Sequence, residues 1–318
     1  VALIEFGGLW LKSASLLPQA KWLEQAIGWS FTPVRPVLKF ALTIAFTSAV
    51  WVLVTQTDKL VLSGILPLAE YGYFTLAVLV ASGIVVVSGP VSSAIMPRMA
   101  KLHAEDNSTE LLQVYCNATQ LVSIIAGTAA ITLSLCAEPL LFAWTGDKVL
   151  TEKAAPILML YSMGNGFLSM AAFSYYLQYA KGNLRYHLIG NAVMIVTLIP
   201  GIIFAANYYG AIGAGYVWLT VKGLFFFAWV AYVHHKIEPD LHWRWLRNDI
   251  LAVVIPPICL AYALTMINFK TEARLDSVMY TSIFGSVILI CSLLSSKNIR
   301  YRFVKYLKLR LRYEKFMR

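Results

Sequence analysis

The sequence predicts an all-α polytopic membrane protein with eight transmembrane helices. Its 318 residues are 59% hydrophobic and only 13% charged, and the mean hydropathy is +0.67. Soluble domains average about 45 to 50% apolar and about 25% charged residues, so this chain cannot cover its apolar side chains with a polar surface. The composition excludes a disordered chain and argues strongly against a water-soluble enzyme.

Eight apolar segments have the length of membrane-spanning helices. They occupy 37–56, 74–95, 117–143, 154–178, 188–206, 211–233, 250–267 and 278–294. About 17 to 25 apolar residues cross the bilayer as a helix, whereas a membrane β-barrel shows shorter segments of alternating polarity. A helix also satisfies its backbone hydrogen bonds within the segment, which the lipid environment requires.

The connections on the outer side are short. We expect outer loops at 57–73, 144–153, 207–210 and 268–277. None of them is long enough to fold as a catalytic domain, so the protein is expected to act within the bilayer. The apolar run 1–11 is too short to span, and we expect it to be the end of an earlier helix of a longer protein.

The basic residues are unevenly distributed. With the N-terminal segment taken as cytoplasmic, 20 of the 26 Lys and Arg residues fall on the cytoplasmic side, five fall outside, and Lys222 lies within a span. The positive-inside rule therefore predicts that both ends of the chain are cytoplasmic. Nine of these cations lie in the tail 297–318, which suits contact with anionic lipids or a simple topology anchor, but not a nucleic-acid-binding surface.

Glycine and proline residues fall together within four predicted spans, at 89–90, 164–166, 200–201 and 256–257. Broken helices are tolerated in lipid where the freed backbone groups line a cavity, and transporters use such places for binding and movement. These positions are therefore candidate hinges. The alternative is that Gly and Pro are simply more frequent in membrane helices than in soluble ones.

Lys222 is the most informative single residue, because it lies near the middle of the segment 211–233. An ammonium group at that depth costs about 2.5 to 3.5 kcal/mol on insertion scales. We expect it to face a wet cavity or to pair with an acid. The alternative is a tilted helix from which the side chain extends to a membrane surface.

Three further polar residues are candidates for a substrate or ion pathway. Asp58 follows the first predicted span and can accept a proton, pair with a cation of another helix, or be solvated at the interface. Glu138 has a similar position near the outer end of its span. Asn165 can hydrogen-bond to a neighbouring helix or to a sugar hydroxyl, as can Asn191.

Four tyrosines gather near the cytoplasmic end of the segment 154–178, namely Tyr175, Tyr176, Tyr179 and Tyr186. Flat rings at the rim of a cavity suit the faces of sugars, but Tyr and Trp are also enriched at both interfaces of any membrane protein. The five histidines lack metal-ligand spacing, so no metal and no cofactor are expected. The sequence also contains neither a phosphate-binding loop nor a nucleophile elbow, so no enzymatic activity is expected.

Several strings of this sequence resemble one family. They are TQTDKLVLSGILPLAEYGYFTLA at 55–77, PVSSAIMPRMAKL at 90–102, LLFAWTGD at 140–147 and YYGAIGAGYVWL at 208–219. In this order they resemble the bacterial O-antigen and capsular polysaccharide flippases, which belong to the multidrug, oligosaccharidyl-lipid and polysaccharide exporter superfamily. The resemblance covers about residues 37 to 247.

The resemblance implies a two-lobed exporter fold of which this chain is the C-terminal portion. Residues 1–36 would be the end of a preceding helix and a cytoplasmic connector, and 37–233 the six-helix second lobe. Residues 234–295 would be a cytoplasmic loop with an extra helix pair, followed by the basic tail 296–318.

It also implies an activity, the flipping of a polyprenyl-diphosphate-linked oligosaccharide across the bacterial inner membrane by alternating access. The product would enter lipopolysaccharide or another surface polysaccharide, and a polysaccharide polymerase or ligase is a possible partner. A drug or toxin exporter of the same fold stays open as an alternative, as does a membrane-embedded polymerase or ligase.

Overall fold

The computed structural model describes residues 34–267, 273–297 and 299–300. The chain divides into two compact units, 1–46 and 47–318. The described part of the first unit is the beginning of the first helix below, and the packing described in this section belongs to the second unit. Most of the predicted connector 1–36 and of the predicted basic tail 296–318 lies outside the described residues.

The described residues are helical and contain no strand, which confirms the all-α fold class. The helices are α2 (Val34–Ile65), α3 (Leu68–Ala104), α4 (Ser108–Leu135), α5 (Ala137–Thr145), α6 (Lys148–Ala180), α7 (Arg185–Leu224), the π-helix η1 (Phe225–Trp229), α8 (Val230–Ile237), α9 (Leu241–Trp245), the π-helix η2 (Leu246–Leu251), α10 (Ala252–Thr265) and α11 (Arg274–Ser295). The eight predicted spans coincide with helical segments, except that 117–143 is divided at Cys136 into α4 and α5 and that 250–267 overruns the end of α10 by two residues.

Six helices in the described part are long and apolar enough to cross a membrane. One of them, Arg185–Ile237, has 53 residues and would reach about 80 Å as a straight rod, far more than the hydrocarbon thickness. It reverses at Gly210, whose φ of 60° and ψ of −145° lie in a region that only glycine adopts readily. The predicted pair 188–206 and 211–233 is therefore a helical hairpin inside this one element.

Small residues let the two halves of this hairpin pack closely. A β-carbon on Gly213 would lie 2.4 Å from the carbonyl oxygen of Ala205, and one on Gly190 would lie 2.5 Å from Nε1 of Trp229. These pairs match residues before the turn with residues after it, in antiparallel order. The close contact fixes the face that the second half, including Lys222, presents to the other helices.

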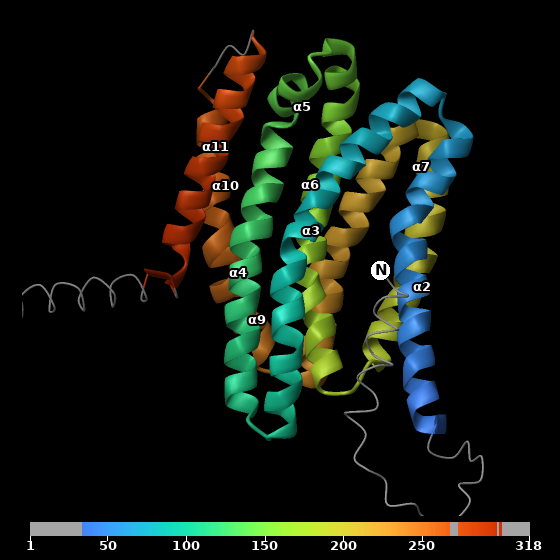
Figure 1. Ribbon diagram of the computed structural model, residues 1–318, viewed down its shortest axis with the longest axis vertical. Coiled ribbons are helices and arrows are strands. Elements are labelled where there is room, and N and C mark those ends of the chain that lie inside the picture. The colour runs from blue at the N-terminus through green and yellow to red at the C-terminus, as the bar shows by residue number, and fades with distance from the viewer. Residues whose placement is uncertain (1–33, 268–272, 298, 301–318) are drawn as a thin grey trace, which may run out of the picture. The chain divides into compact units, whose positions relative to one another are not determined.

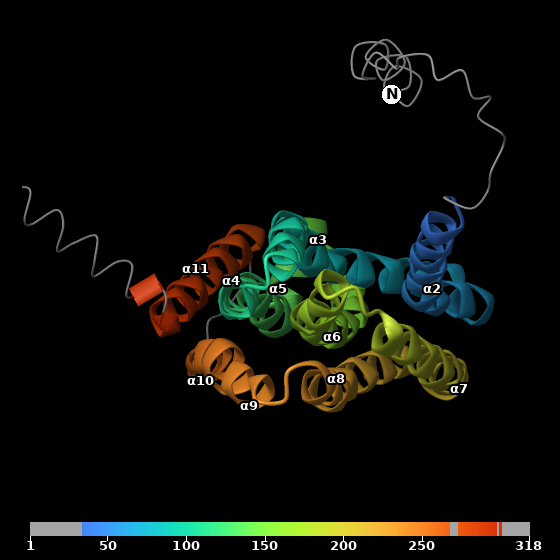
Figure 2. The ribbon, with the colours of Figure 1, turned by 90° about the horizontal axis from the view of Figure 1, so that it is seen from below.

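Helix α6 lies among the other helices of the bundle and packs against α3, α4, α5 and α7 (Figures 1 and 2). Its interior-facing side chains contribute to two apolar clusters. One is centred on Phe74, Tyr161 and Trp218, and the other contains Phe173 and Trp245. Large apolar side chains also cover exposed faces of the bundle, which is the arrangement expected of helices surrounded by lipid.

The connections 105–107, 181–184 and 238–240 lie at the same end of the bundle, which we call the basic end (Figure 1). Ion pairs join Arg98 to Glu110 at 2.9 Å and Lys181 to Glu238. The second pair connects the end of α6 to the end of α8. The connections 66–67, 146–147 and the turn at Gly210 lie at the opposite end.

One sequence prediction about helix ends is wrong. The predicted outer loop 57–73 is helical except at residues 66 and 67, because Asp58 is buried within α2 and does not mark where the chain leaves the membrane. The four Gly and Pro positions at 89–90, 164–166, 200–201 and 256–257 all lie inside continuous helices. The bundle departs from regular α-helix at Gly210 and at the π-helices η1 and η2 instead.

The hairpin turn gives a first prediction. Replacing Gly210 by alanine forces a side chain into a glycine-only backbone conformation, so the free energy of unfolding should fall by about 1 to 3 kcal/mol. The matched control is Gly83→Ala, because a β-carbon there meets nothing within 4 Å and alanine favours a helix. Unfolding by denaturing detergent measures both, and equal effects of the two variants would contradict the strained turn.

Candidate functional site

Lys222 is buried, with 2% of its surface exposed. Its Nζ atom lies 3.1 Å from the sulfur of Met194 and 4.4 Å from the centroid of the Trp218 ring. Lys222 takes part in none of the ion pairs within 4.0 Å that the described residues form. The ammonium group is therefore held inside the bundle by a soft sulfur atom and the face of an aromatic ring, both weak partners for a full charge.

A cavity of about 380 Å³ adjoins Lys222. It lies between α2, α6 and the two halves of the α7 hairpin, in the half of the bundle nearer the basic end. Its lining is mostly apolar and aromatic, with polar groups at intervals. The lining residues are Ser48, Trp51, Val52, Val54, Leu168, Ala171, Ala172, Ser174, Tyr175, Tyr176, Gln178, His187, Asn191, Met194, Lys222, Phe225 and Trp229.

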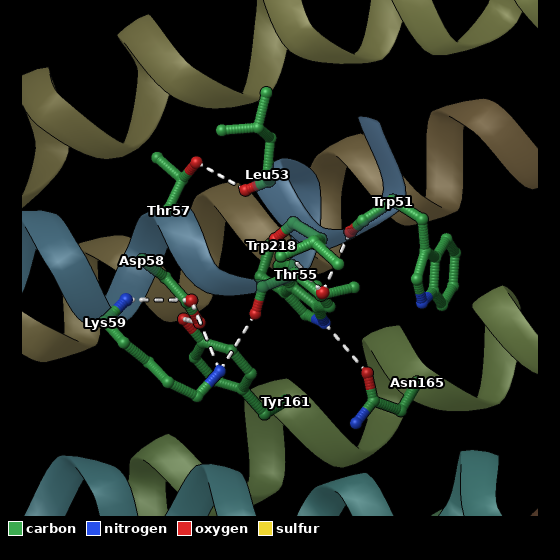
Figure 3. Close-up of polar contacts among 10 residues, drawn as sticks. Trp51, Leu53, Thr55, Thr57, Asp58, Lys59, Tyr161, Asn165 and Trp218 are labelled. Atoms are coloured by element: carbon green, nitrogen blue, oxygen red, sulfur yellow. Dashed lines mark hydrogen bonds and ion pairs between the residues drawn. The ribbon is translucent and has the colours of Figure 1, made fainter. Parts of the chain in front are cut away.

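Asp58 is also buried, with 1% of its surface exposed. Its Oδ2 atom accepts a hydrogen bond of 2.9 Å from the hydroxyl of Tyr161, and Oδ1 accepts one of 2.8 Å from the backbone N–H of Lys59. The Lys59 ammonium lies 3.6 Å from the same carboxylate and donates to the carbonyl of Thr55 (Figure 3). Both oxygens of the buried carboxylate therefore have hydrogen-bond donors, as a buried polar group requires.

Asn165 connects two helices to α6. Its Nδ2 donates a hydrogen bond of 2.9 Å to the carbonyl of Ala81 on α3, and its Oδ1 accepts one of 3.1 Å from Nε1 of Trp218. The Trp218 ring stacks on Tyr161 with a centroid distance of 5.3 Å and an interplanar angle of 18°. Gly164 leaves room for this arrangement, because a β-carbon there would lie 2.4 Å from Trp218.

These contacts form one connected group, the polar cluster, which comprises Asp58, Tyr161, Asn165, Trp218 and Lys222. Three of the four residues selected from the sequence therefore meet at one place, contributed by α2, α6 and α7. Tyr161 bonds to the carboxylate, its ring stacks on Trp218, and the Lys222 ammonium lies over the Trp218 ring. The two charged residues are therefore connected through aromatic rings and form no direct ion pair.

Glu138, the fourth selected residue, is not part of the cluster. It is exposed in the first turn of α5, where a negative charge interacts favourably with the helix dipole. Of the four tyrosines, Tyr175 and Tyr176 line the cavity, whereas Tyr186 packs against Tyr232 with a centroid distance of 5.9 Å.

Sequence reasoning missed Tyr161, Trp218, Gln178 and His187. Spacing gives a signal for the first two, because Tyr161 precedes Asn165 by four residues and Trp218 precedes Lys222 by four. Residues four apart share a helix face, so Asn165 and Lys222 each have an aromatic neighbour on the same face of their own helix.

No group of three or more His, Cys, Asp or Glu residues in the described segments could hold a metal ion. The closest arrangement is near the basic end, where Nε2 of His234 lies 2.7 Å from the Tyr115 hydroxyl. Its Nδ1 lies 3.2 Å from Nδ1 of His242. These hydrogen bonds join α4, α8 and α9.

Comparisons with known proteins agree with this architecture. A family model described as a polysaccharide biosynthesis protein matches residues 11–154. The fold is similar to that of the lipid II flippase MurJ in an inward closed conformation, with a TM-score of 0.65 at 15% sequence identity over 89% of this chain. The family match and the fold agree with the polysaccharide flippases that the sequence resembles.

The likeness to the lipid II flippase is one of fold, and the chain spans 58% of that protein's length. A search of curated protein sequences found no match. The six long apolar helices of the described part indicate a multi-pass membrane protein, and the polar cluster with its adjoining cavity is the candidate functional site.

The Asp58 contact gives a second prediction. Tyr161→Phe removes the only side-chain donor to Oδ2 among the described residues, so the free energy of unfolding should fall by about 1.5 to 3 kcal/mol. Tyr71→Phe is the matched control, because the Tyr71 hydroxyl has no hydrogen-bond partner in the described structure, and its effect should stay within about 0.5 kcal/mol. Unfolding in denaturing detergent measures both, and similar values would show that Tyr161 contributes only through its ring.

Proposed function

We propose that this protein translocates a polyprenyl-diphosphate-linked oligosaccharide across the bacterial inner membrane by alternating access, for O-antigen or another surface polysaccharide. The observation that carries the proposal is Lys222, a buried ammonium group beside a cavity, without a carboxylate in direct contact. The match to a polysaccharide biosynthesis family and the flippase-like fold support a transporter rather than an enzyme.

The physical problem of such a substrate is its diphosphate. Phosphate groups cannot enter hydrocarbon without counter-charge, so a flippase needs a cation at membrane depth. Lys222 supplies that charge, and its present partners are weak enough to be exchanged for a phosphate oxygen. A lysine in a direct ion pair with a carboxylate would have to break that pair first.

The other selected residues have different proposed roles. Asp58 is proposed as a structural or ion-coupling acid, because its charge acts on Lys222. Asn165 is proposed to keep α3, α6 and α7 in register around the site. Glu138 stays a candidate for the outer part of the pathway, in which case it acts at a distance from the polar cluster.

The orientation, the partners and the domain division are part of the proposal. The basic end is placed in the cytoplasm, because Lys and Arg concentrate there. The tail 301–318 is proposed to contact anionic lipids, and a polysaccharide polymerase or ligase is the proposed protein partner. The six-helix lobe 37–233 and the extra pair 234–295 stay predicted divisions of the chain.

A drug exporter of the same fold is the second candidate function. The apolar and aromatic lining of the cavity, which includes Trp51, Phe225 and Trp229, would also suit an apolar drug. Efflux of a fluorescent dye from a complemented strain separates this function from oligosaccharide flipping.

The third prediction tests the proposed function. Lys222→Ala should lower surface polysaccharide about ten- to a hundredfold, since it removes one charge-assisted contact with the diphosphate. Surface polysaccharide is quantified in a strain that depends on this protein, together with the abundance of the protein in the membrane. Lys153→Ala is the control, because Lys153 is exposed near the opposite end of α6.

The two lysine variants must differ for the proposal to stand. Wild-type polysaccharide from Lys222→Ala at normal abundance would remove Lys222 from the mechanism. If Lys222→Ala abolishes dye efflux but leaves surface polysaccharide unchanged, the result would favour the drug exporter.

A further inference from the structure

One wall of the cavity carries a buried hydrogen-bond acceptor without a partner. Gln178 is 1% exposed, and its Nε2 donates a hydrogen bond of 3.1 Å to the carbonyl of Ser174. Its Oε1 atom, equally buried, accepts no hydrogen bond. Among the described residues, seven buried side-chain atoms lack a hydrogen-bond partner, and the Gln178 oxygen is the one whose residue lines this cavity. Because buried polar atoms are usually paired, this position suits a donor from a bound molecule.

The facing helix offers a complementary pair of groups. His187 and Asn191 both line the cavity, and Nδ2 of Asn191 lies 3.1 Å from Nε2 of His187. Because the amide nitrogen can only donate, Nε2 accepts and the ring proton of a neutral His187 lies on Nδ1. The pair therefore keeps one donor, Nδ1–H, and one acceptor, Oδ1 of Asn191, for another molecule.

Aromatic rings complete this part of the cavity. The Tyr175 ring lies against His187 with a centroid distance of 4.2 Å. Trp229 lines the cavity from η1 and packs directly over Gly190 on α7. A π-helical turn at such a place is frequent at functional sites.

From this geometry we infer a carbohydrate subsite formed by Gln178, His187 and Asn191 together with the rings of Tyr175 and Trp229. A sugar presents hydroxyl donors and acceptors around its edge and apolar C–H groups on its faces, which matches unpaired donors and acceptors beside flat rings. The inference rests on the proposed function and deepens it, because it names the residues that would recognise a sugar of the lipid-linked oligosaccharide.

The position of the subsite indicates which sugar it holds. Lys222 contacts Met194, and His187 lies seven residues before Met194 on the same face of α7, or about 10 Å along the helix axis. That spacing suits a diphosphate at Lys222 followed directly by the first sugar. The cavity of about 380 Å³ is near the lower limit for pockets that enclose drug-sized ligands, so the later sugars remain in water at the basic end.

Binding of short-chain probes to the intact purified protein tests this subsite. The probes are farnesyl diphosphate and its derivatives carrying one glucose or one N-acetylglucosamine. Wild-type protein should bind at least one sugar-bearing probe about tenfold more tightly than the bare diphosphate, the effect of one or two added hydrogen bonds. Gln178→Met and Asn191→Leu should abolish this preference and leave binding of the bare diphosphate unchanged.

Two controls separate the sugar contact from other effects. Asn207→Leu removes an amide from the same helix outside the cavity, where Asn207 donates only to the carbonyl of Ile203, and should keep the preference. Lys222→Ala should weaken binding of bare and sugar-bearing probes by the same factor. Thermal unfolding of each variant shows whether it is folded. Asn191 is only partly buried, so Asn191→Leu still tests the subsite if Gln178→Met is unstable.

The outcomes distinguish the subsite from the proposed function. If wild type binds the bare diphosphate without preferring either sugar, or if Gln178→Met and Asn191→Leu keep the preference, the subsite is wrong and the flippase proposal stands. The unpaired Gln178 oxygen would then be satisfied by water alone. If wild type binds none of the probes, both proposals fall.

Discussion

A lysine ammonium buried at the depth of the hydrocarbon is the constraint on which the rest of this bundle depends. Such a group is costly in a membrane protein, and the cost falls only if neighbouring groups compensate the charge. Here the compensation comes from the ring of Trp218, the sulfur of Met194 and the more distant carboxylate of Asp58. These groups belong to α2 and to both halves of the α7 hairpin. The packing of α2 against the α7 hairpin therefore also determines how the Lys222 charge is compensated.

Helix α6 connects the residues around Lys222 to the other helices of the bundle. Tyr161 and Asn165 lie on one face of α6 and bond to α2, α3 and α7 at nearly the same depth. A movement that separates α6 from α7 at this level would break the Trp218 hydrogen bond and the ring stacking together. The contacts of Tyr161 and Asn165 therefore fix α6 against α7 at this level of the bundle.

How much of this could be predicted from sequence differs between the fold and the site. The spans could be predicted because long apolar segments in lipid form helices that satisfy their own backbone hydrogen bonds. The end of α2 could not be predicted, because a charged residue such as Asp58 is usually found at the membrane surface and here is buried within the helix. Lys222, Asp58 and Asn165 could be selected because polar groups at membrane depth are expensive. That they meet depends on helix packing, which hydropathy does not encode. Gln178 and Trp218 were missed because amides near helix ends and aromatic belts occur in any membrane protein.

The charges of the cluster place a further demand on the proposed transport. A diphosphate carries more negative charge than one ammonium group neutralises, and Lys222 is the single Lys or Arg among the described residues that line the cavity. The buried carboxylate of Asp58 belongs to the same cluster, and its negative charge would repel a diphosphate bound at Lys222. In the proposed mechanism, a cation bound at Asp58 would remove that repulsion and strengthen binding of the diphosphate. By thermodynamic linkage, the bound diphosphate would in turn favour occupancy of the acid by the ion. Ion coupling can therefore arise from this one pair without direct contact between ion and substrate.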